Sequence, residues 1–440
     1  MKKSFKNREQ ILQKLGIEKL NPMQEEAFEA VMAKEDTILL SPTGTGKTLA
    51  FLLPLLENLD PDLEEVQTMI LVPSRELAIQ IEQVTREMGS GFKANAVYGG
   101  RAFSKDKEEL SHAPAILIGT PGRLADHLRR ESFAVEHIHS LILDEFDKSL
   151  EVGFEEEMKE IITALPNLKK RILTSATQNI EIPSFTGLSS ARTVNYLSDS
   201  NPGLRTELLV STSRDKFECL AQLLENTGNK SGIIFCNFKE SIAEVSHFLQ
   251  KAAISHGSFY GGLEQKERER ALIKFRNGTY RILLATDLAA RGIDVPEIDF
   301  IVHYQLPHRK EEFIHRNGRT ARMHKEGIAY VLQYEKEILP DYIVPDSYSK
   351  NIGKISNREL HNKTSLATLF ISGGRKDKIS KGDIAGLFLK QGKLAKEELG
   401  LIELKQDCAF VSVPASKAVQ LISILNNTRL KKKKVRIKQV

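Results

Sequence analysis

The chain is poor in cysteine and has no long apolar run, and each shortage excludes a class of protein. Its 440 residues include three cysteines, Cys219, Cys236 and Cys408, which lie far apart. Three separated thiols form neither a disulfide framework nor a CxxC metal site. No segment approaches the roughly 18 apolar residues that a membrane span needs, and no apolar stretch follows the N-terminal lysines. We therefore expect a cytoplasmic protein in a reducing compartment, without a membrane partner.

The composition also lacks the excess of glycine, proline or charge that marks disordered chains. Apolar residues make up 41% and charged residues 28%, with 28 Gly and 15 Pro. These values are ordinary for globular proteins. The length corresponds to about three domains of ~150 residues. Bulk disorder and a single small binding module are both excluded.

The positive charge of the chain is concentrated at its C-terminus. The formal net charge is +5, yet residues 366–440 alone hold 16 Lys and Arg against 6 Asp and Glu. Basic side chains that neutralise phosphates release counterions and give sequence-independent affinity for a polyanion. The basic run Arg429–Lys438 fits a polyanion-binding surface and a solvated tail equally well.

Two stretches of the chain repeat the same alternation of short apolar runs with longer amphipathic segments. The pattern indicates parallel sheets wrapped by helices, hence two α/β domains in tandem. The apolar runs of the first stretch are 37–41, 69–72, 115–119, 140–144 and 171–175, and those of the second begin at 232, 281 and 300. Polar connectors follow each stretch. We predict domains at 1–200 and 201–345, a linker at 346–365 and a third domain at 366–440.

A glycine-rich loop, Ser41–Thr48, lies directly after the first predicted strand and before an apolar helix. This context is the one that a phosphate-binding loop requires, and it disfavours an ordinary turn. Successive backbone N–H groups there would cradle phosphates at the helix N-terminus. Lys47 would neutralise phosphate charge, and the Thr48 hydroxyl would bind Mg²⁺. The remaining predicted nucleotide-binding residues of the loop are Thr43, Gly44, Thr45 and Gly46.

An acidic string, Asp144-Glu145-Phe146-Asp147, ends the predicted strand 140–144. Its carboxylates should emerge at the carboxyl edge of the sheet, where open α/β folds bind ligands. Asp144 would hold Mg²⁺, largely through water, and Glu145 would orient and deprotonate an attacking water. Acidic strand ends are common on protein surfaces, but the phosphate loop makes this one a candidate site for nucleotide hydrolysis.

These motifs, with Gly16–Gln24, resemble those of the DEAD-box ATP-dependent RNA helicases, and the resemblance covers about the first 330 residues. It implies two RecA-like domains, an RNA-dependent ATPase, and ATP and Mg²⁺ as cofactors. It assigns Gln24 to the adenine base and Asp294 to the ATP ribose. Phe146 stands where the family usually has alanine.

The resemblance also implies contacts with the sugar-phosphate backbone of RNA. Guanidiniums, hydroxyls and N–H groups of Pro-Gly turns suit such contacts, which carry no base information. The implied RNA-binding residues are Arg75, Gly100, Thr120, Gly122, Arg123, Gln265, Arg268 and Thr286. The residues that would couple hydrolysis to strand separation are Asp147, Ser175, Thr177 and His315, with Asp147 bonded to the Ser-Ala-Thr string.

Two arginines of the second domain, Arg319 and Arg322, are expected one helical turn apart, so that both face the same partner. An Arg-x-x-Arg pair is usually a solvated helix face. Here, however, the phosphate loop of the other domain needs further cations. The resemblance implies that both arginines hold the γ-phosphate across the domain gap.

The C-terminal segment resembles an RNA-recognition module and, more closely, the C-terminal domain of DbpA-type helicases, which target ribosomal RNA. Residues 369–371 and 409–413 match its first and third strands, where aromatic side chains stack on bases. A small α+β, RRM-like fold is therefore expected. A small domain that binds protein, or nothing, remains the alternative.

We thus predict an ATP-dependent RNA helicase that locally unwinds or remodels duplexes through ATP-driven closure of two RecA-like domains. Structured ribosomal RNA during ribosome assembly is the expected substrate, and a monomer the expected state. One alternative is an RNA chaperone or clamp for assembly with little steady-state hydrolysis. Another is a DNA-directed translocase, against which the adenine and ribose motifs argue.

Overall fold

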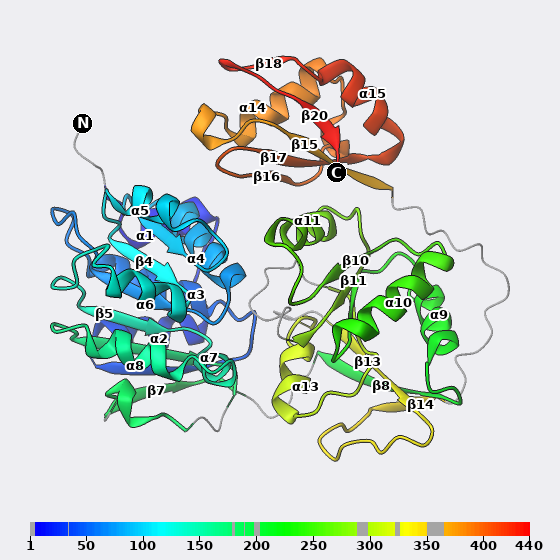
Figure 1. The fold of residues 1–440 in the computed structure, drawn as a ribbon, viewed down its shortest axis with the longest axis horizontal. Helices are drawn as coiled ribbons and strands as arrows, with labels where there is room; N and C mark the ends of the chain where they lie inside the picture. Colours follow the sequence, from blue (N-terminus) through cyan, green and yellow to red (C-terminus); the bar gives the residue numbers. More distant parts are fainter. Residues whose placement is uncertain are drawn as a thin grey trace. The chain divides into compact units, whose positions relative to one another are not determined.

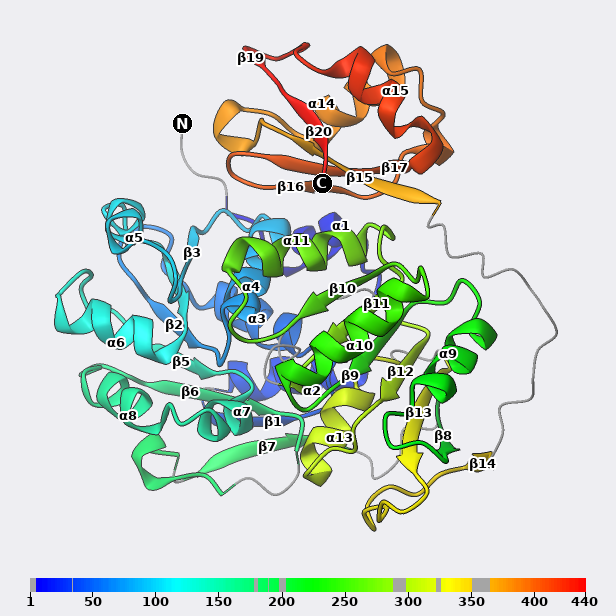
Figure 2. The ribbon, with the colours of Figure 1, turned by 45° about the vertical axis from the view of Figure 1, so that its right-hand side comes forward.

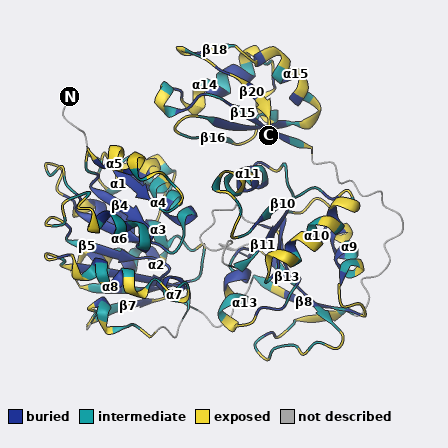
Figure 3. Cartoon of the chain, in the orientation of Figure 1, coloured by how far each residue is buried: buried dark blue, intermediate teal, exposed yellow. Residues whose placement is uncertain are grey.

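The computed structural model describes residues 5–33, 35–177, 181–188, 190–197, 203–287, 298–321, 326–349 and 365–440. These residues form two compact units, and each unit holds one seven-stranded parallel sheet (Figure 1). The strands of both sheets are largely buried, whereas exposed residues lie on helices and loops (Figure 3). Within the described residues, no helix has the length and apolar character needed to cross a membrane.

The first sheet is parallel throughout, as predicted from its continuous apolar runs. Its strands lie in the order β3 (Ala94–Val97), β4 (Ile116–Gly119), β2 (Thr68–Leu71), β5 (Ser140–Leu143), β6 (Lys170–Ser175), β1 (Asp36–Leu40) and β7 (Ala191–Asn195). The strands β5, β6 and β1 are therefore neighbours, and their carboxyl ends share one edge. A second group of neighbours, β3, β4 and β2, shares the same edge.

Helices cover both faces of the first sheet because each strand carries apolar side chains on both sides. One face packs against α3 and α4 around Phe51 and Ile81, and the other packs against α6 and α8 around Leu124 and Ile161. The helices of this unit are α1 (Arg8–Leu15), α2 (Pro22–Met32), α3 (Lys47–Glu57), α4 (Arg75–Met88), α5 (Phe103–Leu110), α6 (Pro121–Arg129), α7 (Phe146–Glu151), α8 (Glu155–Thr163) and the short η1 (Ser184–Thr186).

The second parallel sheet confirms the predicted tandem RecA-like arrangement. Its order is β10 (His256–Phe259), β11 (Ile282–Ala285), β9 (Gly232–Phe235), β12 (Phe300–His303), β13 (Gly327–Tyr334), β8 (Leu204–Ser211) and β14 (Ser347–Ser349). Helices α9 and α10 pack on it through Leu220 and Val245 (Figure 2). The described helices of this part are α9 (Phe217–Asn226), α10 (Lys239–Lys251), α11 (Gln265–Arg276) and α13 (Lys310–Asn317).

Helix α13 ends earlier than the arginine spacing suggested, so one structural prediction is wrong. Gly318 caps the helix, with its N–H donating to the Ile314 carbonyl at 2.9 Å. Thr320 then turns toward the sheet, where its hydroxyl donates to the Ile298 carbonyl at 2.6 Å. Arg319 thus follows the end of the helix, so the helical position predicted for it is wrong. Arg322 lies outside the described residues.

The C-terminal segment folds as the predicted α+β domain. Its four-stranded antiparallel sheet runs β16 (Ile402–Leu404), β17 (Ala409–Pro414), β15 (Leu366–Ile371) and β20 (Ile437–Gln439). Residues Leu369 and Val411 point into the core with the helices, so alternation places Phe370 and Phe410 on the other face. The remaining elements are α14 (Lys381–Gly386), α15 (Ala415–Leu425), the hairpin β18 (Arg429–Leu430) and β19 (Lys433–Lys434), the 3₁₀-helices η2 (Arg375–Asp377) and η4 (Lys396–Glu398), and the π-helix η3 (Leu387–Gln391).

Candidate functional site

The loop Ser41–Thr48 connects β1 to α3 and is tied together by its own side chains. The Ser41 and Thr45 hydroxyls lie 2.7 Å apart, and Thr45 also donates to the Pro42 carbonyl at 2.9 Å. Gly44 and Gly46 both adopt φ of +88°, which side chains rarely tolerate. The loop therefore holds a compact turn that leads straight into the N-terminus of α3.

Gln24 caps helix α2 and reaches this loop. Its backbone N–H and side-chain oxygen form a capping box with Asn21, at 2.9 and 3.0 Å. The amide Nε2 of Gln24 then donates to the Gly46 carbonyl at 3.3 Å, and Asn21 donates to the Thr45 carbonyl at 3.0 Å. A Cβ atom on Gly46 would lie 2.4 Å from Gln24 Nε2, so glycine is required for this approach. The predicted adenine-reading residue and the phosphate loop are thus joined.

Lys47 lies at the start of α3 with its ammonium inside the loop. Nζ donates to the carbonyls of Ser41 at 2.5 Å and Pro42 at 3.0 Å. Burial lowers the pKa of Lys47 to about 8, while the neighbouring Asp144 and Glu145 favour the charged form. The structure therefore brings this lysine and the acidic string at the end of β5 into one electrostatic cluster.

Asp144 ends β5 as a buried carboxylate. Its Oδ1 accepts hydrogen bonds from the Thr174 hydroxyl of β6 and from the Glu145 N–H at 3.2 Å. Burial and, second, the charge of Glu145 raise the pKa of Asp144 to about 6. Glu145 follows in a left-handed conformation with φ of +49°, where non-glycine residues are strained. This left-handed residue turns the chain between the end of β5 and the start of α7, so the Asp144 and Glu145 carboxylates lie at the turn.

The predicted coupling contact between β5 and β6 is formed. The Thr177 hydroxyl donates to Asp147 Oδ2 at 3.2 Å, and Ser175 Oγ accepts from the Thr177 N–H at 3.0 Å. Phe146 is fully buried in the apolar core of this unit. The Phe146 ring, at the position where the family usually has alanine, therefore packs in the core. It does not prevent the contact between Asp147 and Thr177.

The predicted RNA-contacting residues of the first unit follow β2, β3 and β4, which are neighbours in the sheet. Arg75 begins α4 and lies against the turn at Gly100, where a Cβ atom would stand 2.5 Å from Arg75 Nη1. Thr120 caps α6, and Gly122 and Arg123 lie in its first turn. Helix N-termini and guanidiniums at one sheet edge suit phosphate and sugar contacts.

Two predicted RNA-contacting residues of the second unit, Arg268 and Thr286, both contact Phe259. Gln265 and Arg268 belong to the first turn of α11, and the Arg268 guanidinium lies 4.8 Å from the ring centre of Phe259. Thr286 follows β11 and donates its N–H to the Phe259 carbonyl at 3.4 Å. His315 and Arg319 are buried. Asp294 and Arg322 lie outside the described residues, so their roles stay predictions.

Three family models match the chain in sequence order. The DEAD/DEAH box helicase model covers residues 21–184, the helicase conserved C-terminal domain model covers 215–324, and the DbpA RNA binding domain model covers 368–439. The ATP-dependent RNA helicase DbpA of Bacillus subtilis (strain 168) is 31% identical over 97% of this chain and 96% of its own length. The chain belongs to the DEAD-box ATP-dependent RNA helicases. A DbpA helicase of Escherichia coli (strain K12) matches at the same identity and coverage.

Solved DEAD-box structures share the fold. The helicase Dbp5 of S. cerevisiae, bound to RNA and ADP BeF3, is 28% identical, with a TM-score of 0.67 over 75% of this chain and 88% of its own. The DEAD-box helicase Mss116, bound to ssRNA and UDP-BeF, is 25% identical, with a TM-score of 0.68 over 78% of this chain and 77% of its own. The chain is accordingly an ATP-dependent RNA helicase with RNA-dependent ATPase activity.

The acidic edge of this helicase fits a magnesium ion that is shared with a nucleotide. Mg²⁺ is commonly held by one or two carboxylates, water and the phosphates of a substrate. Asp144 and the Thr48 hydroxyl offer oxygen donors, and a cation there would offset the burial and the repulsion by Glu145 that together raise the pKa of Asp144. Among the described residues, no group of three or more His, Cys, Asp or Glu side chains could hold a metal unaided. Because Asp144 and Thr48 supply only two oxygen donors, binding through water and phosphate suits this donor set.

The raised pKa of Asp144 predicts an acid limb in the ATPase profile. Asp144 must be ionised to act beside a cation, so kcat/KM for ATP should fall about ten-fold per unit as the pH drops below about 6. The hydrogen bond from Thr174 lowers that pKa. In a Thr174→Val variant the acid limb of the ATPase profile should move to higher pH. The titration of ATP itself would not move, so the shift distinguishes the two causes. An unchanged limb in this variant would contradict the assignment.

Two buried ion pairs at these motifs were missed from the sequence. Lys148 is fully buried, with Nζ 2.9 Å from Glu145 Oε1. Arg316 is 1% exposed and binds both oxygens of Asp287 at 2.6 Å, tying α13 to the end of β11. The signal for these pairs in the sequence was weak: Lys148 is a basic residue three positions after Glu145, and Arg316 lies between His315 and Asn317.

Proposed function

We propose that this helicase locally unwinds or remodels RNA duplexes through ATP-driven closure of its two RecA-like domains, acting on structured ribosomal RNA during ribosome assembly. The observation that carries the proposal is the shared edge of the first sheet. The phosphate loop follows β1, the acidic string follows β5, and the predicted RNA contacts follow β2, β3 and β4. The contact of Thr177 with Asp147 provides a route between hydrolysis and the conformation of this edge.

The ATP site in this proposal uses the residues of both RecA-like domains. Gln24 hydrogen-bonds the adenine, the backbone of residues 43–46 cradles the phosphates, and Lys47 neutralises their charge. Mg²⁺, held by Thr48 and Asp144 largely through water, would neutralise charge on the β- and γ-phosphates. Glu145 orients the attacking water and accepts its proton, and Lys148 restrains the Glu145 carboxylate at 2.9 Å. Asp294 binds the ribose, and Arg319 and Arg322 grip the γ-phosphate.

The proposed cycle is a shift between two conformations. ATP and single-stranded RNA each bind the closed state better than the open state, so each promotes binding of the other. Closure bends one RNA strand, which a duplex cannot accommodate. Hydrolysis removes the phosphate held by Arg319 and Arg322, and the two domains separate. The helicase then melts short duplexes locally without travelling along them.

The choice of RNA is assigned to the C-terminal domain. The DbpA RNA binding domain model matches residues 368–439, and the region 366–440 carries 16 Lys and Arg against 6 Asp and Glu. The face of its sheet opposite the helices carries Phe370 and Phe410, whose ring centres lie 5.7 Å apart. Aromatic rings and cations together suit structured RNA with unpaired bases. Ribosomal RNA is proposed because the segment resembles the DbpA-type domain.

Solution scattering tests the closure step directly. We expect the radius of gyration to decrease when a non-hydrolysable ATP analogue and oligo-U are added together, and to change little with either alone. A Lys47→Ala variant, which cannot neutralise the phosphates, serves as the control and should stay open. Equal scattering of the wild-type protein with and without both ligands would contradict the proposed cycle.

A further inference from the structure

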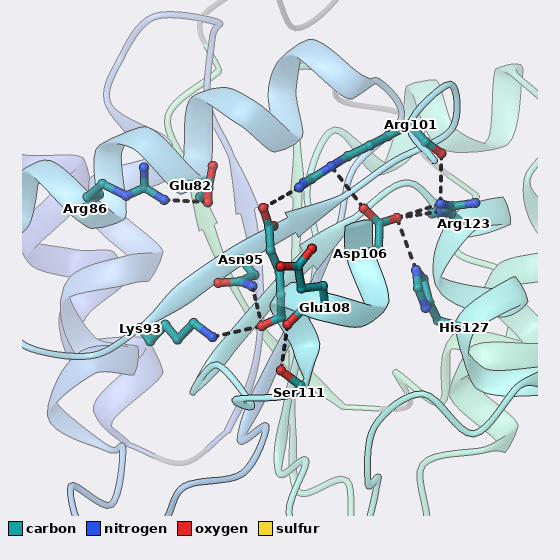
Figure 4. A network of polar contacts seen from close by, with 11 residues as sticks. Glu82, Arg86, Lys93, Asn95, Arg101, Asp106, Glu108, Ser111, Arg123 and His127 are labelled. Carbon is teal, nitrogen blue, oxygen red and sulfur yellow. Dashed lines mark hydrogen bonds and ion pairs between the residues drawn. The ribbon is translucent and has the colours of Figure 1, made fainter. Parts of the chain in front are cut away.

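Helix α5 carries a buried carboxylate that has no part in the ATP site. Asp106 is completely buried, yet it faces three basic side chains (Figure 4). Arg123 approaches its Oδ2 with Nε at 2.8 Å and Nη2 at 2.7 Å. His127 Nε2 lies 3.3 Å from the same oxygen, and Arg101 Nε lies 3.3 Å from Oδ1. A charge buried this deeply is costly unless it is paired, so the cluster forms as a unit.

The ionised form of Asp106 is the stable one in this cluster. Burial alone would raise its pKa, but hydrogen bonds from His127 and Arg123, together with the charges of Arg123 and Arg101, lower the pKa below its usual value. The carboxylate therefore remains negative at neutral pH and holds the neighbouring guanidiniums by charge as well as by hydrogen bonds.

The guanidinium of Arg123 is held from three sides. Asp106 binds two of its nitrogens, the Arg101 carbonyl accepts from Nη2 at 3.0 Å, and the Phe103 ring lies 5.0 Å from its central carbon. That ring is itself stacked on His127, with centres 4.4 Å apart. Nη1 lies 3.6 Å from Asp126 at the surface, beyond good hydrogen-bond distance. The orientation of the Arg123 guanidinium is thus fixed by its contacts on the buried side.

We propose that Asp106 is a positioning residue for RNA binding, which presents the Arg123 guanidinium in one orientation to the sugar-phosphate backbone. The inference rests on the proposed RNA contact of Arg123. An arginine side chain has many rotamers, and RNA binding by a free one must first restrict them. A guanidinium already fixed by Asp106 avoids most of that cost, so affinity for RNA rises. Asp106 touches neither RNA nor ATP in this arrangement and acts through Arg123.

The test compares Asp106→Asn with Asp126→Asn in RNA-stimulated ATPase assays with oligo-U. Both variants remove one negative charge beside Arg123, but only the first removes it from the buried contact, where a charged hydrogen bond becomes a weaker neutral one. We expect Asp106→Asn to raise the KM for RNA about ten-fold and to change kcat at saturating RNA by no more than about two-fold. Asp126→Asn should leave the KM for RNA close to wild type or lower it. A purely structural role would lower kcat without this split and would overturn the inference.

A double-mutant cycle shows whether Asp106 acts through Arg123. In an Arg123→Ala background, Asp106→Asn should cause no further rise in the KM for RNA, and an additive rise would overturn the inference. An unchanged KM for RNA in Arg123→Ala alone would overturn both this inference and the proposed RNA contact. A raised KM in Arg123→Ala with a normal KM in Asp106→Asn would overturn only the inference.

A measurement on the wild-type protein covers the case in which Asp106→Asn fails to fold. The Nε–H group of Arg123, bonded to Asp106 at 2.8 Å, should exchange with solvent much more slowly than that of Arg205, whose side chain is 63% exposed. The signals are assigned by NMR through their loss in Arg123→Ala and Arg205→Ala. Equal exchange rates at the two sites would overturn the inference.

Discussion

Replacement of Glu145 by glutamine should nearly abolish RNA-stimulated ATP turnover. A positioned general base contributes about 10²- to 10⁴-fold to a rate, and the Glu145 carboxylate, which follows β5, is the group proposed for this role. Glutamine keeps the size of the side chain but cannot accept the proton of water. We therefore expect kcat to fall within that range while ATP and RNA still bind. Steady-state phosphate release with saturating oligo-U measures the effect.

The matched control for this variant is Glu151→Gln, at the far end of the helix that Glu145 precedes. Glu151 is exposed at the end of α7, so its replacement should leave turnover unchanged. Lys47→Ala should abolish turnover as well, but through loss of ATP binding and phosphate neutralisation. Normal turnover in Glu145→Gln would contradict the site assignment. Full RNA remodelling by a Glu145→Gln protein that has lost turnover would instead favour the alternative of a clamp that needs no hydrolysis.

Deletion of residues 366–440 should remove the preference for structured RNA. The segment supplies a large excess of cations, and every phosphate that the protein no longer neutralises reduces the slope of log K against log salt by about 0.7 to 0.9. We expect affinity for structured ribosomal RNA to fall at least about ten-fold at low salt, with a shallower salt dependence. Binding of oligo-U should change much less. An unchanged order of preference among RNAs would remove this domain from target selection.

Point variants of the full chain show, in the same RNA-binding experiment, whether affinity depends on the basic charges or on the folding of the C-terminal domain. In the hairpin, Lys431 pairs with Asp383 at 3.1 Å and Lys433 pairs with Asp377 at 2.8 Å. Lys432 and Lys434, on either side of Lys433, are exposed. A double replacement, Lys432→Gln with Lys434→Gln, should therefore reduce the salt slope without loosening the hairpin. Replacement of Lys431 and Lys433 should also lower the melting temperature, because it breaks both ion pairs.

Much of the ATP site was predictable because its signals are local. A phosphate loop needs a strand, a turn with left-handed glycines and a helix in immediate succession, and Ser41–Thr48 supplies all three. The acidic string and the Ser-Ala-Thr string could be placed together because parallel strands end at one sheet edge. The predicted contact between Asp147 and Thr177 is accordingly present at 3.2 Å.

Other parts of the site depend on packing that no local pattern encodes. The helical position predicted for Arg319 was wrong because α13 ends at Asn317 and the Thr320 hydroxyl bonds to the Ile298 carbonyl. The place of the Phe146 side chain likewise could not be predicted from its position in the sequence beside the acidic residues. Its ring is buried in the core, since the left-handed Glu145 turns the chain at the end of β5.

The sequence by itself determined the family, the parallel α/β architecture and the order of the nucleotide and RNA motifs, because apolar periodicity and loop-forming residues act over a few neighbouring positions. Only the tertiary structure decided the partners of the buried charges. Asp106 meets Arg123 across 17 positions and Arg316 meets Asp287 across 29. Such pairs form because the strands and helices that carry them fold against one another and exclude water, and that proximity is a property of the whole sheet.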